Sequence, residues 1–361
     1  SVFRKRKQNQ WKKRKIIFFI PSGCGGAERQ AIVISRCLRD DEFDVTYHIF
    51  GPSNQLEKFL PTEREVVFHK EPVFTHNMVS NLRKIIKAEK PDVVYGPEMP
   101  VNWRLILASR FLKCRVILRN DNYLYTQSFA QKLRLALTYP FADYIIAQTD
   151  EMRDGLIKGL HLSTSLVHTV ANAIDKEYIK KCISEKNPFD VLEKVRFVAV
   201  GRFHAVKGFD MLVKAFKIVK STIPNAELYI VGEYHKDSPV YQDVQKYIEQ
   251  NGLKDSVVCT GFKANPYVYM KNADCFVLSS RNEGLPNVMI EALYLGTPVA
   301  ALKCIPVIER IVAEGKTGYL AGKENIEELA EAMIKASKLG RIETTYNLNT
   351  EEKFVEIFRQ V

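Results

Sequence analysis

The sequence predicts an α/β protein built from two Rossmann-like, doubly wound domains. Short runs rich in Val, Ile and Phe alternate with amphipathic helical runs along most of the chain, a pattern typical of parallel sheets covered by helices. At 361 residues the chain is longer than one core usually supports, which indicates two domains. A charged segment near the middle, containing Pro188, interrupts the alternation and is expected to link them.

In the first half, β-branched and aromatic runs bounded by turn-forming residues predict seven strands, over residues 15–21, 44–50, 65–69, 92–95, 115–118, 144–148 and 167–170. Apolar residues at helical spacing predict helices between them, over residues 27–39, 77–88, 102–111 and 128–139. The last of these helices carries cations among leucines, so membrane contact and core packing are both open for it.

The second half repeats the alternation. Strands are predicted over residues 196–200, 227–231, 257–260, 275–278, 299–302 and 318–320. Helices are predicted over residues 209–221, 240–251, 266–272, 287–295, 307–313, 326–338 and 350–360.

These elements give five expected regions. Residues 1–15 form a basic arm and residues 16–174 the first domain. Residues 175–194 form the linker and residues 195–340 the second domain. Residues 341–361 carry a last helix that is expected to pack back on the first domain.

Composition excludes several classes of protein. A content of 46% hydrophobic and 26% charged residues is ordinary for a globular protein, and no apolar run reaches the ~18 residues that would span a membrane. The apolar run at 16–20 is too short for a signal peptide. The seven cysteines are scattered without a Cys-x-x-Cys pair, which favours reduced thiols in the cytoplasm over a zinc cluster.

The net charge of +11 is concentrated at the N-terminus. Eight cations and no acid lie in residues 1–15, which leaves about +3 for the remainder. Phe3 and Trp11 accompany these cations, so the arm is expected to hold the protein on an anionic membrane surface, peripherally on the inner face of the cell membrane. A solvated tail is the alternative. A nucleic-acid partner is not expected, because no recognition motif accompanies the arm.

The most informative segment runs from Arg281 to Glu291. Glu283 precedes a Gly-Leu-Pro-Asn turn, and Glu291 lies in the apolar helix that the turn opens. Pro286 suits the first helical position, and Gly296 suits the residue just past the helix end. Backbone N–H groups at a helix start bind phosphate oxygens, and carboxylates bind hydroxyls, so the segment suits a sugar nucleotide. The alternative is a buried helix with an ordinary acidic cap.

Two other strand ends carry candidate ligand contacts. Gly25 and Gly26 lie where the first strand turns into a helix, which lets a ligand approach the backbone; a tight packing turn is the alternative. Arg202 and Lys207 follow the first strand of the second domain and could neutralise a diphosphate; solvated loop charges are the alternative.

A third strand end carries Arg119 and Asn120, which could contact a sugar or an acceptor unless they only form a turn. Other chemistry is missing from the sequence: there is no Asp-x-Asp pair for a magnesium-bound diphosphate, no Walker loop and no dinucleotide Gly-x-Gly-x-x-Gly. No metal is therefore expected, with side-chain cations taking its place.

Together these motifs resemble the nucleotide-sugar glycosyltransferases of family 4 over roughly residues 15–340. The matching parts are residues 25–28, 172–175, 200–208, 261–262 and 283–291. The resemblance implies the GT-B fold, in which two such domains face each other across a cleft, and transfer with retention of anomeric configuration. It also implies that residues 16–174 form the acceptor-side domain and that residues 195–340 bind the nucleotide sugar.

The resemblance also implies roles for the site residues. Arg202 and Lys207 would bind the donor diphosphate, with Glu283 beside the donor sugar as the third catalytic residue. Backbone groups of Gly284, Leu285, Pro286 and Asn287 would lie near the donor, and Glu291 would bind the ribose hydroxyls. Gly25 and Gly26 would leave room for the sugar phosphate.

This sequence departs from the family at two places. Many members have a His near Arg119-Asn120, and none is present here. Asn172 is followed by Ala173 where Asn-Gly is commoner. Arg119, Asn120 and Asn172 are therefore only candidate sugar or acceptor contacts.

The expected function is metal-independent, cofactor-independent transfer of a hexose or N-acetylhexosamine. The donor would be a nucleoside-diphosphate sugar, with UDP inferred by analogy. The acceptor would be a saccharide or a lipid-linked saccharide in surface polysaccharide or glycan biosynthesis. An NAD-linked oxidoreductase and a sugar-nucleotide epimerase are the alternatives, because both use two similar domains. A catalytically silent binding protein is a third.

Overall fold

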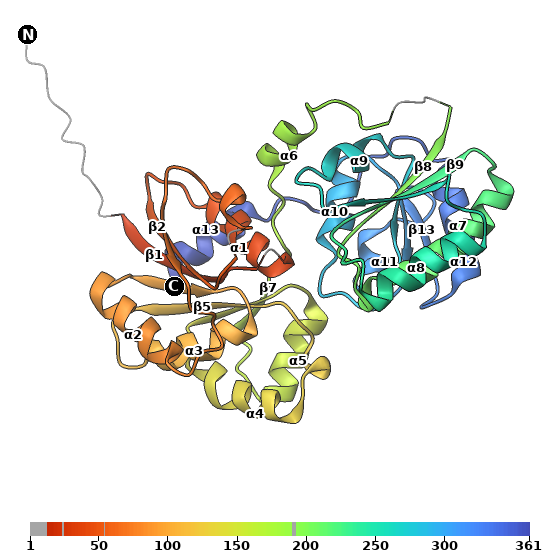
Figure 1. The fold of residues 1–361 in the computed structure, drawn as a ribbon. Helices are drawn as coiled ribbons and strands as arrows, with labels where there is room; N and C mark the ends of the chain where they lie inside the picture. The colour runs from red at the N-terminus through yellow and green to blue at the C-terminus, as the bar shows by residue number, and fades with distance from the viewer. Residues whose placement is uncertain (1–12, 24, 54, 190–192) are drawn as a thin grey trace, which may run out of the picture. The chain divides into compact units, whose positions relative to one another are not determined.

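The computed structural model describes residues 13–23, 25–53, 55–189 and 193–361. The chain divides into two compact units (Figure 1). The first comprises the described parts of Ser1–Ala173 together with Asn349–Val361, and the second comprises the described parts of Ile174–Leu348. Each unit is a parallel sheet with helices wound around it, which confirms the predicted α/β class.

The first unit is built on a seven-stranded parallel sheet in the order β3-β2-β1-β4-β5-β6-β7. Its strands are β1 (Arg14–Pro21), β2 (Phe43–Phe50), β3 (Glu65–His69), β4 (Val93–Gly96), β5 (Arg115–Asn120), β6 (Tyr144–Ala147) and β7 (Val167–Thr169). Residues 16–20 of β1 are completely buried because helices cover both faces of the sheet, and this explains their unbroken apolar run. The strand order reverses between β1 and β4, which is where open α/β sheets bind ligands.

Helices flank this sheet along the chain: α1 (Gly26–Cys37), α2 (Met78–Glu89), α3 (Met99–Ser109), α4 (Phe129–Thr138) and α5 (Asp150–Leu160). The final helix of the chain, α13 (Glu351–Gln360), belongs to this unit too. Its Phe358 is buried, with its ring centroid 5.8 Å from that of Phe18 in β1. The first unit therefore contains both ends of the described chain.

The second unit has a six-stranded parallel sheet in the order β10-β9-β8-β11-β12-β13. Its strands are β8 (Val195–Val200), β9 (Ala226–Val231), β10 (Val257–Gly261), β11 (Cys275–Leu278), β12 (Val299–Leu302) and β13 (Gly318–Ala321). Its helices are α6 (Lys176–Cys182), α7 (Phe209–Thr222), α8 (Pro239–Gln250), α9 (Tyr267–Asn272), α10 (Asn287–Tyr294), α11 (Ile308–Ile311) and α12 (Ile326–Ala336). Here the order reverses between β8 and β11.

The segment at 175–194 differs from the expected linker. It carries α6, and the amide of Asn265 donates to the backbone oxygen of Cys182 at 2.7 Å. The carbonyl at the end of α6 needs a hydrogen-bond donor, and Asn265 of the second unit supplies it. The segment is therefore packed against the second unit and is not a free linker.

The predicted end of the second domain at residue 340 is also too early. Ile342 donates its backbone N–H to Gly296 at 3.0 Å, and the Arg341 guanidinium donates to the Thr297 hydroxyl at 2.8 Å. The second unit consequently runs to Leu348 before the chain returns to the first unit.

The remaining expectations concern the basic arm, membrane-spanning helices and the cysteines. The basic arm falls almost entirely on residues 1–12, which lie outside the described residues, so its membrane role stays a prediction. Within the described part of the chain, no helix is both long and apolar enough to cross a membrane. The six described cysteines are free thiols.

Candidate active site

The candidate donor site in the second unit lies where β8 and β11 end side by side, at the reversal of strand order. Two loops meet there. One leaves β8 and carries Arg202 and Lys207, and the other leaves β11 and carries Glu283. Because the carboxyl ends of parallel strands open at the same edge of a sheet, the topology brings these distant segments together.

Lys207 and Glu283 form an ion pair between the two loops. The Lys207 ammonium lies 2.7 Å from the Glu283 carboxylate, and the Ser280 hydroxyl donates to the same carboxylate oxygen at 2.6 Å. Both charged side chains are largely buried, while Ser280 is fully buried. Charge-assisted hydrogen bonds of this kind fix the position of both groups.

Further bonds hold the two loops in register. Arg281 binds Asp210 through both of its terminal nitrogens, at 2.8 and 2.6 Å. Its backbone N–H donates to the Val206 carbonyl at 2.7 Å, and the Ser279 hydroxyl donates to the Lys207 carbonyl at 2.9 Å. A bidentate Arg–carboxylate pair is geometrically specific, so these contacts define the spacing between Lys207 and Glu283.

Gly208 allows this close approach. It has φ of +64° and caps the start of α7, and a Cβ atom placed on it would come 2.0 Å from the Ser279 carbonyl oxygen. Only glycine fits a position that combines a left-handed backbone with so close a neighbour.

Arg202 lies on the same loop as Lys207 but is exposed. Within the described residues its guanidinium makes no hydrogen bond or ion pair, so it is available to a ligand. His204, between the two cations, accepts a hydrogen bond from the Val206 N–H at 3.3 Å and so caps the short 3₁₀ turn η4 (Ala205–Lys207).

The loop after β11 leads into α10, with one difference from expectation. Pro286 caps α10, and the helix begins at Asn287 rather than at the proline. The Asn287 N–H, expected to point outward, donates to the Leu285 carbonyl at 2.9 Å. Leu285 and Pro286 are buried, Gly284 is half-buried, and Gly296 follows the helix end with φ of +77°.

Glu291, on α10, accepts a hydrogen bond from the Tyr267 hydroxyl at 3.3 Å. Tyr267 is buried, and its ring meets that of Tyr178 edge-on at 6.2 Å. The sequence did not single out Tyr267, because a tyrosine in an apolar helix carries no motif. It orients the carboxylate that is predicted to bind ribose.

In the first unit, Gly25 caps α1 in an extended conformation and Gly26 is the first helical residue. The carboxylate of Glu28 folds back over this turn. Cβ atoms on Gly23 and Gly25 would come 2.4 and 2.7 Å from its two oxygens. The space that the glycines leave is therefore lined by a carboxylate.

Arg119 and Asn120 are expected in a loop after the strand predicted over residues 115–118, but they are less accessible than loop residues would be. Strand β5 continues to Asn120, so Arg119 is inside the sheet and only 1% exposed. Its guanidinium donates to Asn172 at 2.8 Å, and the Asn120 amide donates to the Asn122 carbonyl at 2.5 Å. Arg119, Asn120 and Asn172 are all buried, so their role as sugar or acceptor contacts stays a prediction.

Two carboxyl groups, Glu98 and Asp121, lie near this buried arginine, and the sequence did not single out Glu98. Glu98 caps α3 at the end of β4, and its carboxylate has no hydrogen-bond donor among the described residues. Burial, with the neighbouring Glu28 and Asp121, raises its pKa to about 8, although Arg119 opposes the change. Burial also raises the pKa of Asp121.

The buried groups beneath these carboxylates are incompletely satisfied. The Tyr95 hydroxyl, one oxygen of Asp121 and Nε of Arg119 lack hydrogen-bond partners in the described structure. Unpaired buried polar atoms are uncommon, so this cluster at the carboxyl ends of β4 and β5 is notable. In the sequence, this cluster is indicated only by the position of Glu98 just after β4, the strand that pairs with β1.

Both halves of the chain match models of glycosyltransferase families. Residues 24–178 match the model described as Glycosyltransferase Family 4, and residues 183–355 match the model described as Glycosyl transferases group 1.

Relatives and solved structures agree with these matches. An uncharacterized glycosyltransferase of Methanocaldococcus jannaschii is 30% identical over 238 residues, which are 61% of this chain and 58% of the relative. A 4-alpha-N-acetylgalactosaminyltransferase of Campylobacter jejuni, acting on a diphospho-undecaprenol saccharide according to its name, is 26% identical over 57% of this chain and 54% of the relative. These alignments span less than two thirds of either relative.

Similarity of the fold extends further. The crystal structure of Anabaena HepE in complex with UDP-glucose superposes with a TM-score of 0.77 at 18% identity, over 96% of this chain and 98% of that one. A UDP-GlcNAc 2-epimerase of Methanocaldococcus jannaschii superposes with a TM-score of 0.66 at 16% identity, over 96% of this chain and the whole of that one. The fold is thus GT-B, and fold alone does not separate transferase from epimerase. The two family models together extend over nearly all of the described chain, and the protein belongs to the family 4 glycosyltransferases.

Proposed function

We propose that this protein transfers a hexose or N-acetylhexosamine residue from a nucleoside-diphosphate sugar, preferably a UDP-sugar, to a saccharide or lipid-linked saccharide. The proposal includes retention of anomeric configuration and a role in surface polysaccharide or glycan biosynthesis. The observation that carries it is the Lys207–Glu283 ion pair of 2.7 Å at the ends of β8 and β11, with Arg202 exposed on the same loop.

The donor would lie along these loops. Arg202 and Lys207 would bind the diphosphate, the first through a planar bidentate group and the second as a point charge. Glu291, oriented by Tyr267, would accept hydrogen bonds from the ribose hydroxyls. The complex of HepE with UDP-glucose supports a UDP-sugar as the donor.

The reaction would exchange one bond at the anomeric carbon for another. The bond from this carbon to the diphosphate oxygen breaks, the bond to the acceptor oxygen forms on the same face, and the acceptor proton passes to a departing phosphate oxygen. Negative charge grows on the diphosphate as it leaves, and Arg202 and Lys207 would stabilise it without a metal ion. Loss of one such preorganised partner typically costs ~10²–10³ in rate.

Glu283 would act on the sugar side of the same step. Its carboxylate holds the Lys207 ammonium and accepts from Ser280, so it would keep the cation in place beside the donor sugar. We propose that all three residues are catalytic, with Gly25 and Gly26 admitting the sugar phosphate to the site.

The acceptor would use the first unit. Carboxyl groups accept hydrogen bonds from hydroxyls, and a protonated one such as Glu98 also donates, so Glu98 and Glu28 at the reversal of strand order suit a saccharide. The Campylobacter relative's name, which specifies a diphospho-undecaprenol saccharide, supports a lipid-linked acceptor. A cytoplasmic protein held at the inner membrane face by its basic arm would meet such an acceptor.

Thermal unfolding with UDP, GDP, ADP, CMP and NAD, each with magnesium or with EDTA, tests the donor site. A ligand at ~100 times its Kd adds ~2.7 kcal/mol of stability. We expect a nucleoside diphosphate to raise Tm in EDTA. Arg202→Ala, Lys207→Ala and Glu291→Gln should reduce the rise, and Glu283→Gln should largely keep it while slowing transfer. Lys246→Ala, an exposed lysine on α8, is the matched control.

Several outcomes would contradict the proposal. A response to NAD alone would favour an oxidoreductase. Conversion of a UDP-sugar to its epimer without any acceptor would favour an epimerase. Normal transfer by Arg202→Ala would remove that residue from the mechanism.

A further inference from the structure

A group of apolar side chains stands exposed on the first unit. Of the twelve large hydrophobic side chains exposed in the described chain, eight lie between residues 74 and 141. On α4, Phe129, Leu133 and Leu137 are 82%, 51% and 65% exposed. They recur every four residues and so form one stripe, while Leu135 and Thr138 face inward.

Helix α3 and the residues that follow it run beside this stripe. The Arg134 guanidinium lies 4.8 Å from the Trp103 ring, and the Arg110 guanidinium lies 4.0 Å from the Phe141 ring. Residues 103–110 and 134–141 therefore run in parallel, with exposed Leu107 between the two contacts. Figure 1 shows α3 and α4 on the outside of this unit. We call Leu107, Phe111, Phe129, Leu133, Leu137 and Phe141 the α3–α4 face.

Phe111 is the most exposed member, at 91%, and it has φ of +62°. A bulky residue rarely adopts this left-handed conformation, and a buried contact could explain the cost, but none is made here. The Arg110 guanidinium lies 5.0 Å from the Phe111 ring centroid, and the rest of the ring is available to a partner outside the folded unit.

Cations outnumber acids around the α3–α4 face. From Met99 to Phe141 the only acid is Asp121, which is inside the site above Arg119. The cations beside the face are Arg104, Arg110, Lys113, Lys132 and Arg134.

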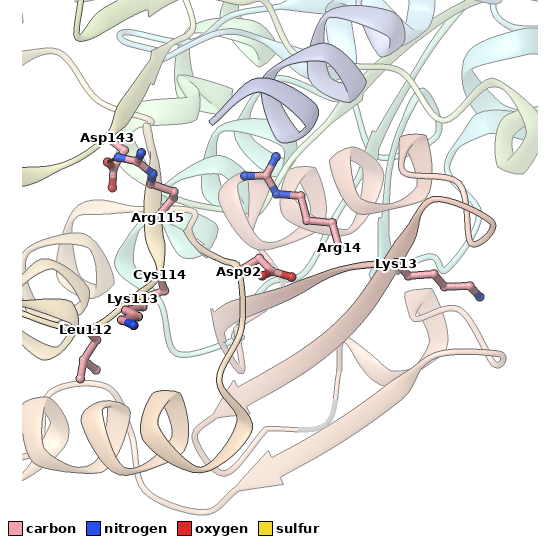
Figure 2. Close-up of a pocket in the computed structure, with 8 residues that line it drawn as sticks. All are labelled: Lys13, Arg14, Asp92, Leu112, Lys113, Cys114, Arg115 and Asp143. Atoms are coloured by element: carbon pink, nitrogen blue, oxygen red, sulfur yellow. Dashed lines mark hydrogen bonds and ion pairs between the residues drawn. The ribbon is translucent and has the colours of Figure 1, made fainter. Parts of the chain in front are cut away.

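Positive charge continues from this face into a neighbouring hollow. The hollow has a volume of about 770 Å³ and is lined in part by Lys13, Arg14, Lys113 and Arg115 (Figure 2). Its two acids are already engaged: Asp92 accepts from the Lys15 N–H and Asp143 accepts from Arg115, at 2.8 and 2.7 Å. Lys113 follows Phe111 by two residues, which joins the hollow to the face.

We propose that the α3–α4 face docks on an anionic lipid membrane. Exposed Phe and Leu side chains would enter the boundary between headgroups and acyl chains, and the surrounding cations would pair with lipid phosphates. A second copy of the chain fits less well, because face-to-face contact would bring these cations together, and the neighbouring acid Asp143 already pairs with Arg115. The surface belongs to the folded unit and does not depend on residues 1–12.

Co-sedimentation of the full chain with lipid vesicles tests this docking surface. The vesicles contain either phosphatidylcholine alone or phosphatidylcholine with about 30% phosphatidylglycerol, an anionic content chosen to attract basic surfaces, and no donor or acceptor is added. We expect binding to the anionic vesicles and at least a tenfold weaker affinity for Phe129→Gln/Leu133→Gln/Leu137→Gln. Ile218→Gln/Val258→Thr, which changes exposed apolar side chains of the second unit, should bind like the parent.

Phe111→Asn separates docking from folding. Asparagine tolerates the left-handed conformation, so this variant should keep or raise Tm while binding anionic vesicles several-fold more weakly. A structural role for Phe111 would instead lower Tm.

Three results would overturn the proposal. The parent chain could fail to bind anionic vesicles. The triple variant could bind as well as the parent, with binding lost only when Arg4, Lys5, Arg6 and Lys7 are changed to Gln, which would assign the interaction to the arm. The parent could be a dimer that the triple variant dissociates, with neither binding vesicles, which would make the face a protein interface. None of these results depends on sugar transfer.

Discussion

Glu98 lies at the end of β4, where burial and the carboxylates of Glu28 and Asp121 raise its pKa to about 8. Between about pH 4.5 and 8 the folded protein therefore keeps a proton on Glu98 that the unfolded chain has lost. By linkage, this group's contribution to stability is present at low pH and is lost as the pH rises through that window.

Replacing Glu98 with Gln should remove this dependence. Since the Glu98 side chain is partly exposed, we expect a gain of only ~1 kcal/mol above pH 8, or about 2–4 °C in Tm, and no change near pH 4. Unfolding curves of the parent chain and of Glu98→Gln at pH 4, 6 and 8.5 measure this difference in stability. Exposed Glu57→Gln serves as the control, and an equal gain at all three pH values would show that charge on Glu98 is not the cause.

Single residues also show where sequence reasoning reaches its limit. Short motifs identify Arg202, Lys207, Glu283 and Glu291, because each motif lies at a strand end. The same reasoning selects Arg119, yet that residue is buried in β5. A strand that continues for two more residues changes an exposed loop arginine into an internal one, and local sequence does not resolve that boundary.

At the scale of elements, the donor site depends on two loops held together through Gly208. Its Cβ position lies 2.0 Å from the Ser279 carbonyl oxygen, so any larger residue must separate the β8 and β11 loops. Gly252 has nearly the same backbone, with φ of +65°, but its Cβ position meets no atom within 4 Å.

Comparing Gly208→Ala with Gly252→Ala isolates the collision from the backbone strain. We expect Gly252→Ala to cost ~1–2 kcal/mol, the ordinary penalty for a left-handed alanine, and to keep the nucleotide-induced rise in Tm. Gly208→Ala should cost several kcal/mol and lose that rise. Similar losses in the two variants would mean that the loops tolerate separation.

Most elements are predictable because their patterns are local. Alternating strands and helices, and caps such as Ser128 before α4, lie within a few residues of one another. Helix α6 resembles a linker in sequence because it is short and charged, and it packs through Asn265, which is distant along the chain. The outward stripe of α4 is likewise undecided by sequence, since helical spacing shows a face but not what covers it.

At the scale of the molecule, the chain ends in the unit in which it began. Phe358 of α13 is buried, and its ring lies 5.8 Å from those of both Phe18 and Tyr95 in the first sheet. The first unit is therefore incomplete without the last helix, although the whole second unit lies between them in sequence.

Phe358→Ala should destabilise the first unit by ~3–5 kcal/mol, the usual cost of such a cavity. Scanning calorimetry with and without a nucleoside diphosphate measures it, because the transition that the nucleotide does not shift should move to lower temperature. Phe216→Ala, at a buried position of α7, is the reciprocal control for the second unit. A single transition lowered equally by both substitutions would show that the units unfold together.

The sequence by itself determined the two α/β sheets, the family and the charged groups of the candidate donor site, since these depend on periodicity and on short motifs. Tertiary structure alone decided that Lys207 pairs with Glu283, that Glu98 and Asp121 share a site above Arg119, and that the α3–α4 face stays uncovered. Those properties depend on burial and on contacts between residues far apart in the chain, and the pattern around any one residue does not contain them.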